Sequence, residues 1–330
     1  MGFIAPEGRG PSSSTEYSGM RHKSSLQLAL PATSANLGPA FDAAALALKL
    51  YLKVRATPAA EFSIVAHGRD AQLCAQLENH LILNTYREVL QSECEEITPL
   101  ALRITNEIPI GKGCGSSAAA RLAGIALAVH FSGLPWTDSR IVGEASRREH
   151  HPDNAAACWV GGLALARMAC ENQAQVVRVK PKGKWPLMVA IPGETLSTEE
   201  ARQVLPAKYS RADAIANVQN SMLLLAAFIE ARHDLLAAAL NDRFHQPYRA
   251  SLCPLLPALT KLVGSRGILG VALSGAGPSV LIFLDPKVSP SKVRQAIRSH
   301  LRTHHLSAEL LESAITHQGA RDARDWNRKR

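Results

Sequence analysis

The chain has 330 residues, longer than one compact core usually needs, so we expect two domains that share a cleft. Hydrophobic residues make up 46% of the chain, which is ample for burial, whereas aromatic residues make up 5%, few for a surface that stacks single-stranded nucleic acid. The net charge of +9 comes largely from basic residues at 21–23 and 321–330, where solvated ends explain it better than a nucleic-acid groove, so we expect no nucleic-acid partner.

Membrane insertion and disulfide chemistry are not expected either. No run approaches the ~18 apolar residues that a membrane crossing needs, and the start of the chain lacks the apolar core of a signal peptide, so we expect a cytoplasmic protein. The cysteines lack a CxxC spacing, which indicates free thiols rather than disulfides or a zinc site. They are Cys74, Cys94, Cys114, Cys158, Cys170 and Cys253.

In chain order, residues 1–23 come first and are rich in Gly, Ser and Pro, so we expect a disordered extension, within which Met20 is a second candidate start. An apolar segment from residue 26 leads into a polar, turn-rich loop at 31–42. Residues 46–54 then alternate Leu or Val with other side chains, and Lys49 and Lys53 lie on the opposite face, which predicts a half-exposed strand.

The rest of the chain mixes strands and helices without regular βαβ alternation, which predicts an α+β fold. Further strands are expected at 62–66, 100–104, 176–179, 187–191, 268–273, 279–284 and near 309–315. Helices are expected at 80–91, 118–131, 137–148, 198–205, 254–263 and 291–302, and at 212–240 with one or two breaks. The expected domains are 24–188 and 189–317, followed by a basic tail at 318–330.

A glycine-rich loop precedes the helix expected at 118–131. Gly111, Gly113 and Gly115 let the backbone bring its N–H groups close to an anion, and the helix behind them points its positive end at a phosphate. Ser116 and Ser117 occupy the position of an N-cap. The spacing is neither that of a Walker A loop nor that of a dinucleotide fingerprint, and an ordinary tight turn is the alternative.

Four polar loops, at 31–42, 111–117, 149–154 and 274–279, interrupt otherwise apolar structure, and each alone is typical of a turn. Together, LPATSANLGPAFDAAALAL, PIGKGCGSSAAARLAGIALA, HPDNAAACWVGG and LSGAGPSVLIF resemble, in order, the motifs of the kinases named for galactokinase, homoserine kinase, mevalonate kinase and phosphomevalonate kinase. The first and third segments, and HQPYR at 245–249, are most similar to the homoserine kinase branch.

The resemblance implies a two-domain small-molecule kinase fold. Its N-terminal domain is a ribosomal-protein-S5-like α/β sandwich, its C-terminal domain is ferredoxin-like α+β, and the active site lies in the cleft between them. The implied reaction is ATP-dependent phosphorylation of the homoserine hydroxyl in threonine biosynthesis, with ATP and Mg²⁺ bound. The oligomeric state is left open, with a homodimer as one option.

The resemblance also assigns the ATP and metal residues. The ATP phosphates are expected against Pro109, Ile110, Gly111, Lys112, Gly113, Cys114, Gly115, Ser116 and Ser117. Mg²⁺ takes oxygen ligands, so a hydroxyl and a carboxylate are needed. Ser117 is the first choice for the hydroxyl and Ser116 the second; Glu149 is the first choice for the carboxylate and Glu144 the second, with a solvated helix charge as the alternative for either glutamate.

Homoserine is a zwitterion, and the family's binding groups fall on residues of both charges. Its carboxylate needs an arginine fork, which Arg202 and Arg249 supply, although Arg202 is also placed to pair with Glu199. The ammonium and hydroxyl are expected near Asn36, Asp42, His151 and Asp153.

In the implied mechanism the hydroxyl attacks the γ-phosphorus directly and Asn154 stabilises the transition state. Asp42 acts as a base only if its carboxylate reaches that hydroxyl. The chain departs from the family at Ala40, Ala45 and Ala157, where glycine, glycine and proline are usual; an alanine at positive φ would strain the loop beside Asp42.

Two other functions are compatible with the motifs: a kinase of the same fold for another small alcohol, such as mevalonate or shikimate, and a catalytically silent nucleotide sensor. The paired arginines beside HPDN disfavour the first. Retention of Ser117, Glu149 and Asp42 disfavours the second, because a sensor does not need metal and transfer groups.

Overall fold

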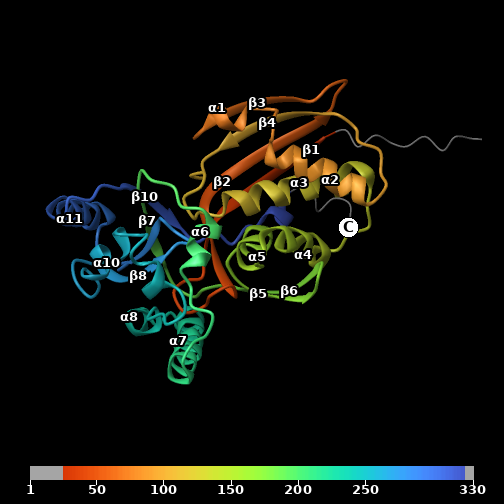
Figure 1. The fold of residues 1–330 in the computed structure, drawn as a ribbon. Coiled ribbons are helices and arrows are strands. Elements are labelled where there is room, and N and C mark those ends of the chain that lie inside the picture. Colours follow the sequence, from red (N-terminus) through yellow and green to blue (C-terminus); the bar gives the residue numbers. More distant parts are fainter. Residues whose placement is uncertain (1–24, 324–330) are drawn as a thin grey trace, which may run out of the picture.

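The structure of the chain is a computed structural model that describes residues 25–323. The extension expected at 1–23 and most of the tail expected at 318–330 lie outside the described residues. The described chain folds into two sheets with helices packed against each, as Figure 1 shows.

The strands are β1 (Leu26–Ala35), β2 (Ala44–Pro58), β3 (Ser63–Gly68), β4 (Leu100–Asn106), β5 (Leu163–Cys170), β6 (Gln173–Val179), β7 (Pro186–Ile191), β8 (Ile268–Leu273), β9 (Val280–Leu284) and β10 (Glu309–Ala314). The helices are α1 (Ala71–Cys74), α2 (Leu81–Ser92), α3 (Ser116–Ser132), α4 (Asp138–Glu149), α5 (Asp153–Val160), α6 (Thr198–Gln203), α7 (Arg211–Glu230), α8 (Leu236–Ala239), α9 (Gln246–Arg249), α10 (Leu255–Thr260) and α11 (Pro290–Thr303). Two 3₁₀ turns lie at His233–Leu235 and Ala320–Asp322.

The first sheet is organised around the long strand β2. Its strand order is β3-β4-β2-β5-β6, and β1 pairs antiparallel with β2 along its whole length. Helices α2, α3, α4 and α5 lie together against this sheet, with α3 and α5 both in contact with β1 (Figure 1). The N-terminal ends of α3 and α5 therefore meet near the end of β1.

The second sheet has the order β10-β7-β9-β8, with every pair antiparallel. Along the chain, helices α6 to α10 lie between β7 and β8, and α11 lies between β9 and β10. This β-α-β-β-α-β order with a split pairing is the ferredoxin-like arrangement. The α+β, two-domain prediction is confirmed. The boundary expected between residues 188 and 189 lies within β7, the strand with which the second sheet begins at Pro186.

Helix α3 shows how the sequence builds the first domain. It begins after Gly115 and ends before Gly133, and both glycines have a left-handed backbone. Most of its side chains between these ends are buried, as expected for a helix that is apolar on all sides. Gly124 lets α2 approach, because a Cβ there would lie 2.5 Å from the carbonyl oxygen of Ile82.

Three segments in particular differ in conformation from the sequence expectation. Residues 31–35, expected as loop, continue β1, because they pair with residues 45–51 of β2. Asp153 and Asn154, expected in a polar loop, are the first residues of α5. The sequence also predicts no strand at 163–170, where β5 lies; the apolar residues there do not alternate clearly, and pairing with β2 and β6 decides the conformation.

Helix α7 is long and apolar enough, by length and composition alone, to cross a membrane, contrary to the expectation that no segment approaches this limit. In the structure it is part of the second domain. Asn217 and Ser221 donate from its inner face to the carbonyl oxygen of Pro39, at 2.7 and 2.8 Å, and Leu224 and Phe228 are buried beside them.

Candidate active site

A cavity lies where the glycine loop, the β1–β2 loop, the start of α5 and the β8–β9 loop meet. Backbone bonds lock these segments together: Thr33 N–H donates to Cys114 O at 3.0 Å, and Gly275 N–H donates to Ala35 O at 3.1 Å. The cavity is lined by Asn36, Asp42, Gly111, Gly113, Gly115, Ser116, Ser117, Glu149, His151, Asp153, Asn154, Leu196, Thr198, Arg202, Arg249, Gly275, Ala276 and Gly277.

The glycine loop forms one wall of this cavity. Gly111, Gly113 and Gly115 have φ values of 68°, 76° and 72°, in the left-handed region that glycine tolerates. A Cβ on Gly113 would lie 2.3 Å from Ser274 O, so glycine is also needed for the contact between the two domains. The expected N-cap is wrong: Gly115 is the N-cap of α3, and the serine hydroxyls that follow make no capping bond.

Four of the predicted ATP residues do not line this cavity. Ile110 lines the neighbouring apolar cavity, and Pro109 and Lys112 line a third one at the β7 edge. The ammonium of Lys112 donates to the carbonyl oxygens of Gly193 and Glu194, across the domain boundary. Cys114 is buried, and burial raises the pKa of its thiol to about 12, as suits a packing residue.

The structure brings together the two groups predicted to bind the metal. Ser117 Oγ donates to Glu149 Oε1 at 2.5 Å, and Arg121 Nε donates to the same oxygen at 2.6 Å. Glu144, the second choice, lies outside the cavity and pairs with Arg147 and Arg148. Burial raises the pKa of Glu144, but these hydrogen bonds outweigh it and the net shift is downward. The geometry favours Glu149 over Glu144.

Asn154 and Asp153 are held in a buried network at the start of α5. Thr33 Oγ1 donates to Asn154 Oδ1 at 2.6 Å. Asp153 Oδ1 accepts from the Asn154 backbone N–H at 2.6 Å and from Asn154 Nδ2 at 3.2 Å. The Asp153 carboxylate only accepts, so its contact fixes which side of the Asn154 amide carries the NH₂ group, and the Thr33 hydroxyl donates to the other side. Sequence reasoning did not single out Thr33; only its place inside the first motif signalled it.

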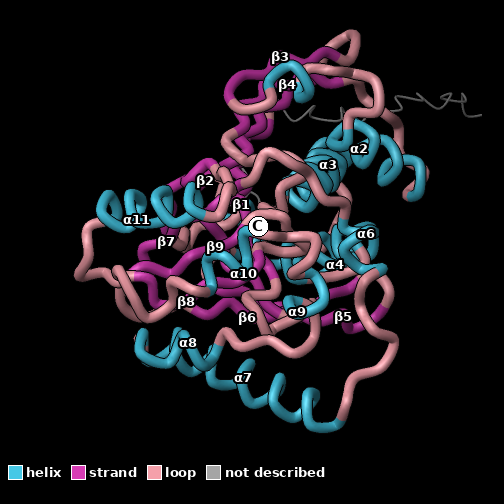
Figure 2. The backbone as a smooth tube through the Cα atoms, turned by 60° about the vertical axis from the view of Figure 1, so that its left-hand side comes forward, coloured by secondary structure: helices cyan, strands magenta, loops and turns pink. Residues whose placement is uncertain are grey.

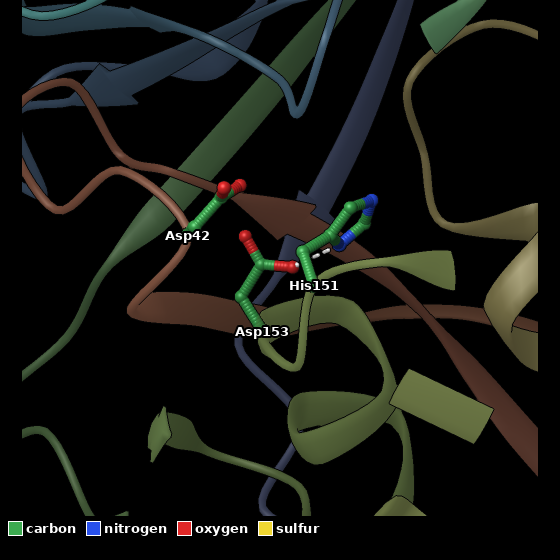
Figure 3. A group of neighbouring side chains, drawn as sticks. All are labelled: Asp42, His151 and Asp153. Atoms are coloured by element: carbon green, nitrogen blue, oxygen red, sulfur yellow. Dashed lines mark hydrogen bonds and ion pairs between the residues drawn. The ribbon is translucent and has the colours of Figure 1, made fainter. Parts of the chain in front are cut away.

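Asp42, His151 and Asp153 form a second polar cluster, drawn in Figure 3, in which one oxygen or nitrogen atom from each side chain lies within 4.8 Å of the other two. His151 Nδ1 and Asp153 Oδ1 are 2.8 Å apart. Burial lowers the pKa of His151, but the bond with Asp153 and the charges of Asp153, Asp42 and Glu149 outweigh it and raise the pKa. The excess of negative charge suits a cation, either a metal ion or an ammonium group.

The two predicted arginines converge on the other side of Asp42. Arg202 Nη2 donates to both carboxylate oxygens of Asp42, at 2.8 and 3.0 Å, rather than to Glu199. Both guanidinium groups also lie near the Phe41 ring, at 5.5 Å for Arg202 and 5.4 Å for Arg249. Burial and the neighbouring Arg202 lower the pKa of Arg249, yet a guanidinium stays charged.

His245 contacts the guanidinium of Arg249. The sequence gives no signal for His245 beyond its place in the segment HQPYR. His245 Nε2 lies 2.9 Å from Gly38 O, and Arg249 Nη1 lies 3.3 Å from His245 Nδ1. Since the guanidinium can only donate, Nδ1 must accept, and the histidine is neutral with its proton on Nε2. Burial, the largest cause, lowers the pKa of His245.

Asn36 orients the β1–β2 loop. Its Nδ2 donates to Gly275 O at 2.9 Å, and its Oδ1 accepts from the Asp42 backbone N–H at 2.9 Å. Asn36, Leu37 and Asp42 have positive φ in this loop. Ala40 does not, and neither do Ala45 and Ala157, which lie in β2 and α5, so the departures from the family motif cause no strain at these alanines.

A second, mostly apolar cavity adjoins the first and shares Gly111, Ser116 and Ser117 with it. Its other walls come from β2, β4, the segment from α1 to the start of α2, and α3. Among the side chains that line it are Leu52, Leu73, Leu81, Ile104, Ile108 and Ile110. A flat, apolar group joined to a phosphate chain fits such a pair of cavities.

Comparison with known proteins agrees with this geometry. Residues 71–162 match the family model described as GHMP kinases N terminal domain, and residues 224–303 match GHMP kinases C terminal. A homoserine kinase of Solibacter usitatus is 41% identical over 292 residues, which cover 88% of this chain and 95% of that protein. A homoserine kinase of Deinococcus radiodurans is 34% identical over 289 residues, which cover 88% of this chain and 94% of that protein.

Solved structures share the fold. A homoserine kinase from Cytophaga hutchinsonii superposes with a TM-score of 0.75 at 24% identity, covering 91% of this chain and 98% of the other. A mevalonate kinase from L. major superposes with a TM-score of 0.65 at 16% identity, covering 89% of this chain and 97% of the other. The resemblance seen in the four motifs is confirmed, and the chain belongs to the homoserine kinase family of the GHMP kinases.

Proposed function

We propose that this chain transfers the γ-phosphoryl group of ATP to the side-chain hydroxyl of L-homoserine, giving ADP and O-phospho-L-homoserine for threonine biosynthesis in the cytoplasm. The observation that carries the proposal is the Asp42–Arg202 ion pair between Asp153 and Arg249. It presents one carboxylate and one guanidinium to the same cavity, which is what a small zwitterion requires.

On binding, the amino acid would replace the ion pair between Asp42 and Arg202 by new ion pairs between its own charged groups and the protein. Its carboxylate would take the forks of Arg202 and Arg249, and its ammonium would lie between the carboxylates of Asp42 and Asp153. Each charge of the protein then keeps an opposite partner, so binding leaves no buried charge unpaired. His151, held by Asp153, would position the hydroxyl end.

ATP would occupy the two adjoining cavities. The apolar cavity beside Ile104 and Ile110 suits the adenine, and the glycine loop, which leads into the N-terminus of α3, suits the phosphates. Ser117 and Glu149 supply the hydroxyl and carboxylate oxygens that suit Mg²⁺, whose charge would offset that of the β- and γ-phosphates.

In the transfer step, the homoserine hydroxyl oxygen forms a bond to the γ-phosphorus. The bond from that phosphorus to the β,γ-bridging oxygen breaks, its electron pair leaves with ADP, and the hydroxyl proton is released. The Asn154 NH₂ would stabilise charge on the transferring group. Once the ion pair has exchanged, Asp42 faces the substrate ammonium, so we assign Asp42 to binding and attribute the rate to positioning and charge neutralisation.

The test is ADP release by the purified protein with ATP, Mg²⁺ and one of homoserine, threonine, mevalonate or shikimate. We expect turnover with homoserine to exceed that with each other alcohol by at least 100-fold in kcat/KM. Threonine is the sharpest control, because it carries the same zwitterion with a different hydroxyl position. Turnover with mevalonate or shikimate but not homoserine would reassign the substrate, and nucleotide binding without turnover on any of them would indicate a sensor.

A further inference from the structure

Helix α6, which carries Arg202, has little apolar packing to hold it in place. It is six residues long, and of these residues, all of which the structure describes, Ala201 alone is buried. Figure 2 shows α6 as a short helix with a stretch of loop on either side. A helix of this length is not stable by itself in water, so contacts with other segments must fix its position.

Two of these contacts lie on the helix itself. Arg202 pairs with Asp42, and Arg249 Nε donates to Ala201 O at 2.8 Å. The first would not survive binding of the amino acid, because the substrate carboxylate is proposed to take Arg202 away from Asp42. Once the site is filled, the position of α6 therefore depends more strongly on the contacts that remain.

Lys112 supplies a contact that binding of the amino acid leaves intact. Its ammonium donates to the carbonyl oxygens of Gly193 and Glu194, at 2.6 Å for Glu194, in the segment between β7 and α6. The side chain lies outside the active-site cavity and lines the cavity at the β7 edge instead. An ammonium is a charged donor with three N–H groups, so two carbonyl oxygens suit it.

The same lysine belongs to the glycine loop. Its neighbours Gly111 and Gly113 line the active-site cavity. A Cβ on Gly111 would lie 3.5 Å from Thr195 Cγ2, so the segment before α6 also packs close to the backbone of this loop. The loop that would hold the phosphates and the segment that leads to Arg202 are therefore joined directly.

We propose that Lys112 is a positioning residue that couples the glycine loop to α6, so that nucleotide bound at the loop strengthens binding of the amino acid carboxylate at Arg202; the identity of the amino acid rests on the proposed function. A phosphate held by N–H groups of the loop fixes the loop. The ammonium then fixes the carbonyl oxygens of Gly193 and Glu194, and Arg202 follows on α6. By linkage, the amino acid strengthens nucleotide binding by the same factor.

A direct bond from Lys112 to a phosphate is the alternative. The ammonium already has two carbonyl acceptors, and its side chain lies outside the cavity in which the phosphates would bind. The two roles differ in a measurable way. Loss of a phosphate ligand weakens nucleotide binding even without amino acid, whereas loss of a coupling residue weakens only the effect of one ligand on the other.

Lys112→Met tests the coupling, because it keeps most of the apolar stem and removes the charged donor. In calorimetry of the full chain with Mg²⁺, we expect a non-hydrolysable ATP analogue to tighten homoserine binding at least tenfold in the wild type and less than twofold in this variant. The affinity for the analogue alone should change less than threefold. In steady-state kinetics, KM for homoserine should rise at least fivefold with kcat within a factor of two. Lys112→Arg, which keeps charged donors, should stay close to the wild type.

Arg69→Met is the matched control. Arg69 is a cation at the same β7-edge cavity, and it also joins the two domains, but its partner is Glu309 on β10, at 2.9 and 2.5 Å, rather than the segment before α6. We expect this variant to keep the tenfold effect of nucleotide on homoserine binding. Melting temperatures check that each variant is folded.

Hydrogen exchange gives a readout that does not need homoserine. With the ATP analogue and Mg²⁺ alone, amide exchange in residues 194–203 should slow at least threefold in the wild type and in Arg69→Met. It should not slow in Lys112→Met. This measurement keeps the coupling testable even if the substrate is another alcohol.

Three outcomes would overturn the proposal. One is a wild-type chain in which nucleotide changes neither homoserine binding nor exchange in residues 194–203. The second is a Lys112→Met variant that behaves as Arg69→Met does. The third is a Lys112→Met variant whose affinity for the ATP analogue alone falls tenfold or more, which would make the lysine a phosphate ligand. Absence of homoserine turnover, with nucleotide still slowing exchange in residues 194–203, would refute the proposed function and leave the coupling in place.

Discussion

Thr33 on β1 and Asn154 on α5 are 121 residues apart in sequence, and a 2.6 Å hydrogen bond joins Thr33 Oγ1 to Asn154 Oδ1 in the interior. A backbone bond from Thr33 N–H to Cys114 O ties the same residue to the glycine loop. Thr33 therefore aligns the amide that would meet the transferring phosphate with the loop that would hold it.

Thr33→Val keeps the shape of the side chain but leaves Asn154 Oδ1 without its donor. We expect kcat to fall about 10- to 100-fold through misorientation of the amide, with KM for homoserine changed less than threefold. Thr33→Ser, which keeps the hydroxyl, should retain most of the activity. If Thr33→Val raised KM and left kcat unchanged, the bond would serve substrate binding instead.

Glu149→Gln removes the charge that the Ser117 hydroxyl contacts. We expect kcat/KM to fall at least 100-fold and the Mg²⁺ concentration for half-maximal rate to rise, together with some loss of stability because the pair with Arg121 is weakened. Glu144→Gln, which breaks the pairs with Arg147 and Arg148, should mainly lower stability. Calorimetry of Mg²⁺·ADP binding separates the two effects, and the opposite ranking would assign the metal to Glu144.

Arg249→Lys replaces a planar guanidinium, which can donate two parallel hydrogen bonds to a carboxylate, by a compact ammonium group. Lysine cannot keep both the 2.8 Å bond to Ala201 O and a paired contact to a carboxylate, so we expect KM for homoserine to rise about tenfold or more. Arg232→Lys is the control, since Arg232 also pairs with a carboxylate, that of Asp234, but on the surface. Steady-state kinetics with homoserine varied would show the difference, and equal KM values for both variants would exclude Arg249 from carboxylate binding.

His245 makes stability depend on pH in a defined direction. Because the folded protein holds the pKa of His245 below its ordinary value of 6.5, the unfolded chain takes up a proton first as pH falls, so stability is present above about pH 6.5 and is lost below it. His245→Gln keeps a donor for Gly38 but does not titrate. Urea unfolding from pH 5 to 7.5 should show a slope shallower by up to about 1.4 kcal/mol per pH unit in this variant; an unchanged slope would mean that His245 is protonated in the folded state.

Alanine substitutions at Gly111 and Gly113 would distinguish the cost of a strained backbone from the cost of a steric clash. Both have left-handed backbones, but a Cβ on Gly111 would meet only Thr195 at 3.5 Å, whereas one on Gly113 would meet Ser274 O at 2.3 Å. We expect Gly111→Ala to lower the free energy of unfolding by about 1–2 kcal/mol and Gly113→Ala to lower it at least twice as much. Equal losses in denaturant unfolding would show that the β8–β9 loop moves aside without cost.

Local patterns predicted much of the fold. The alternation along β2, the glycines that bound α3 and the apolar spacing of α11 each reflect a neighbour a few residues away, so these elements are found close to where they are expected. For residues 31–35 and the start of α5 the sequence predicts loops, because their polar residues are typical of turns when nothing else is known. Pairing with β2 and packing against β1 decided otherwise.

The glycine loop, the family and most of the charged residues that line the cavity follow from residue types at fixed short spacings, so they could be predicted from the sequence. Which groups meet depends on the tertiary structure: Glu149 rather than Glu144 with Ser117, Arg202 with Asp42 rather than Glu199, Thr33 with Asn154, and His245 with Arg249. Those contacts join segments far apart in the chain, and their partners are set by the packing of two domains, which no local pattern encodes.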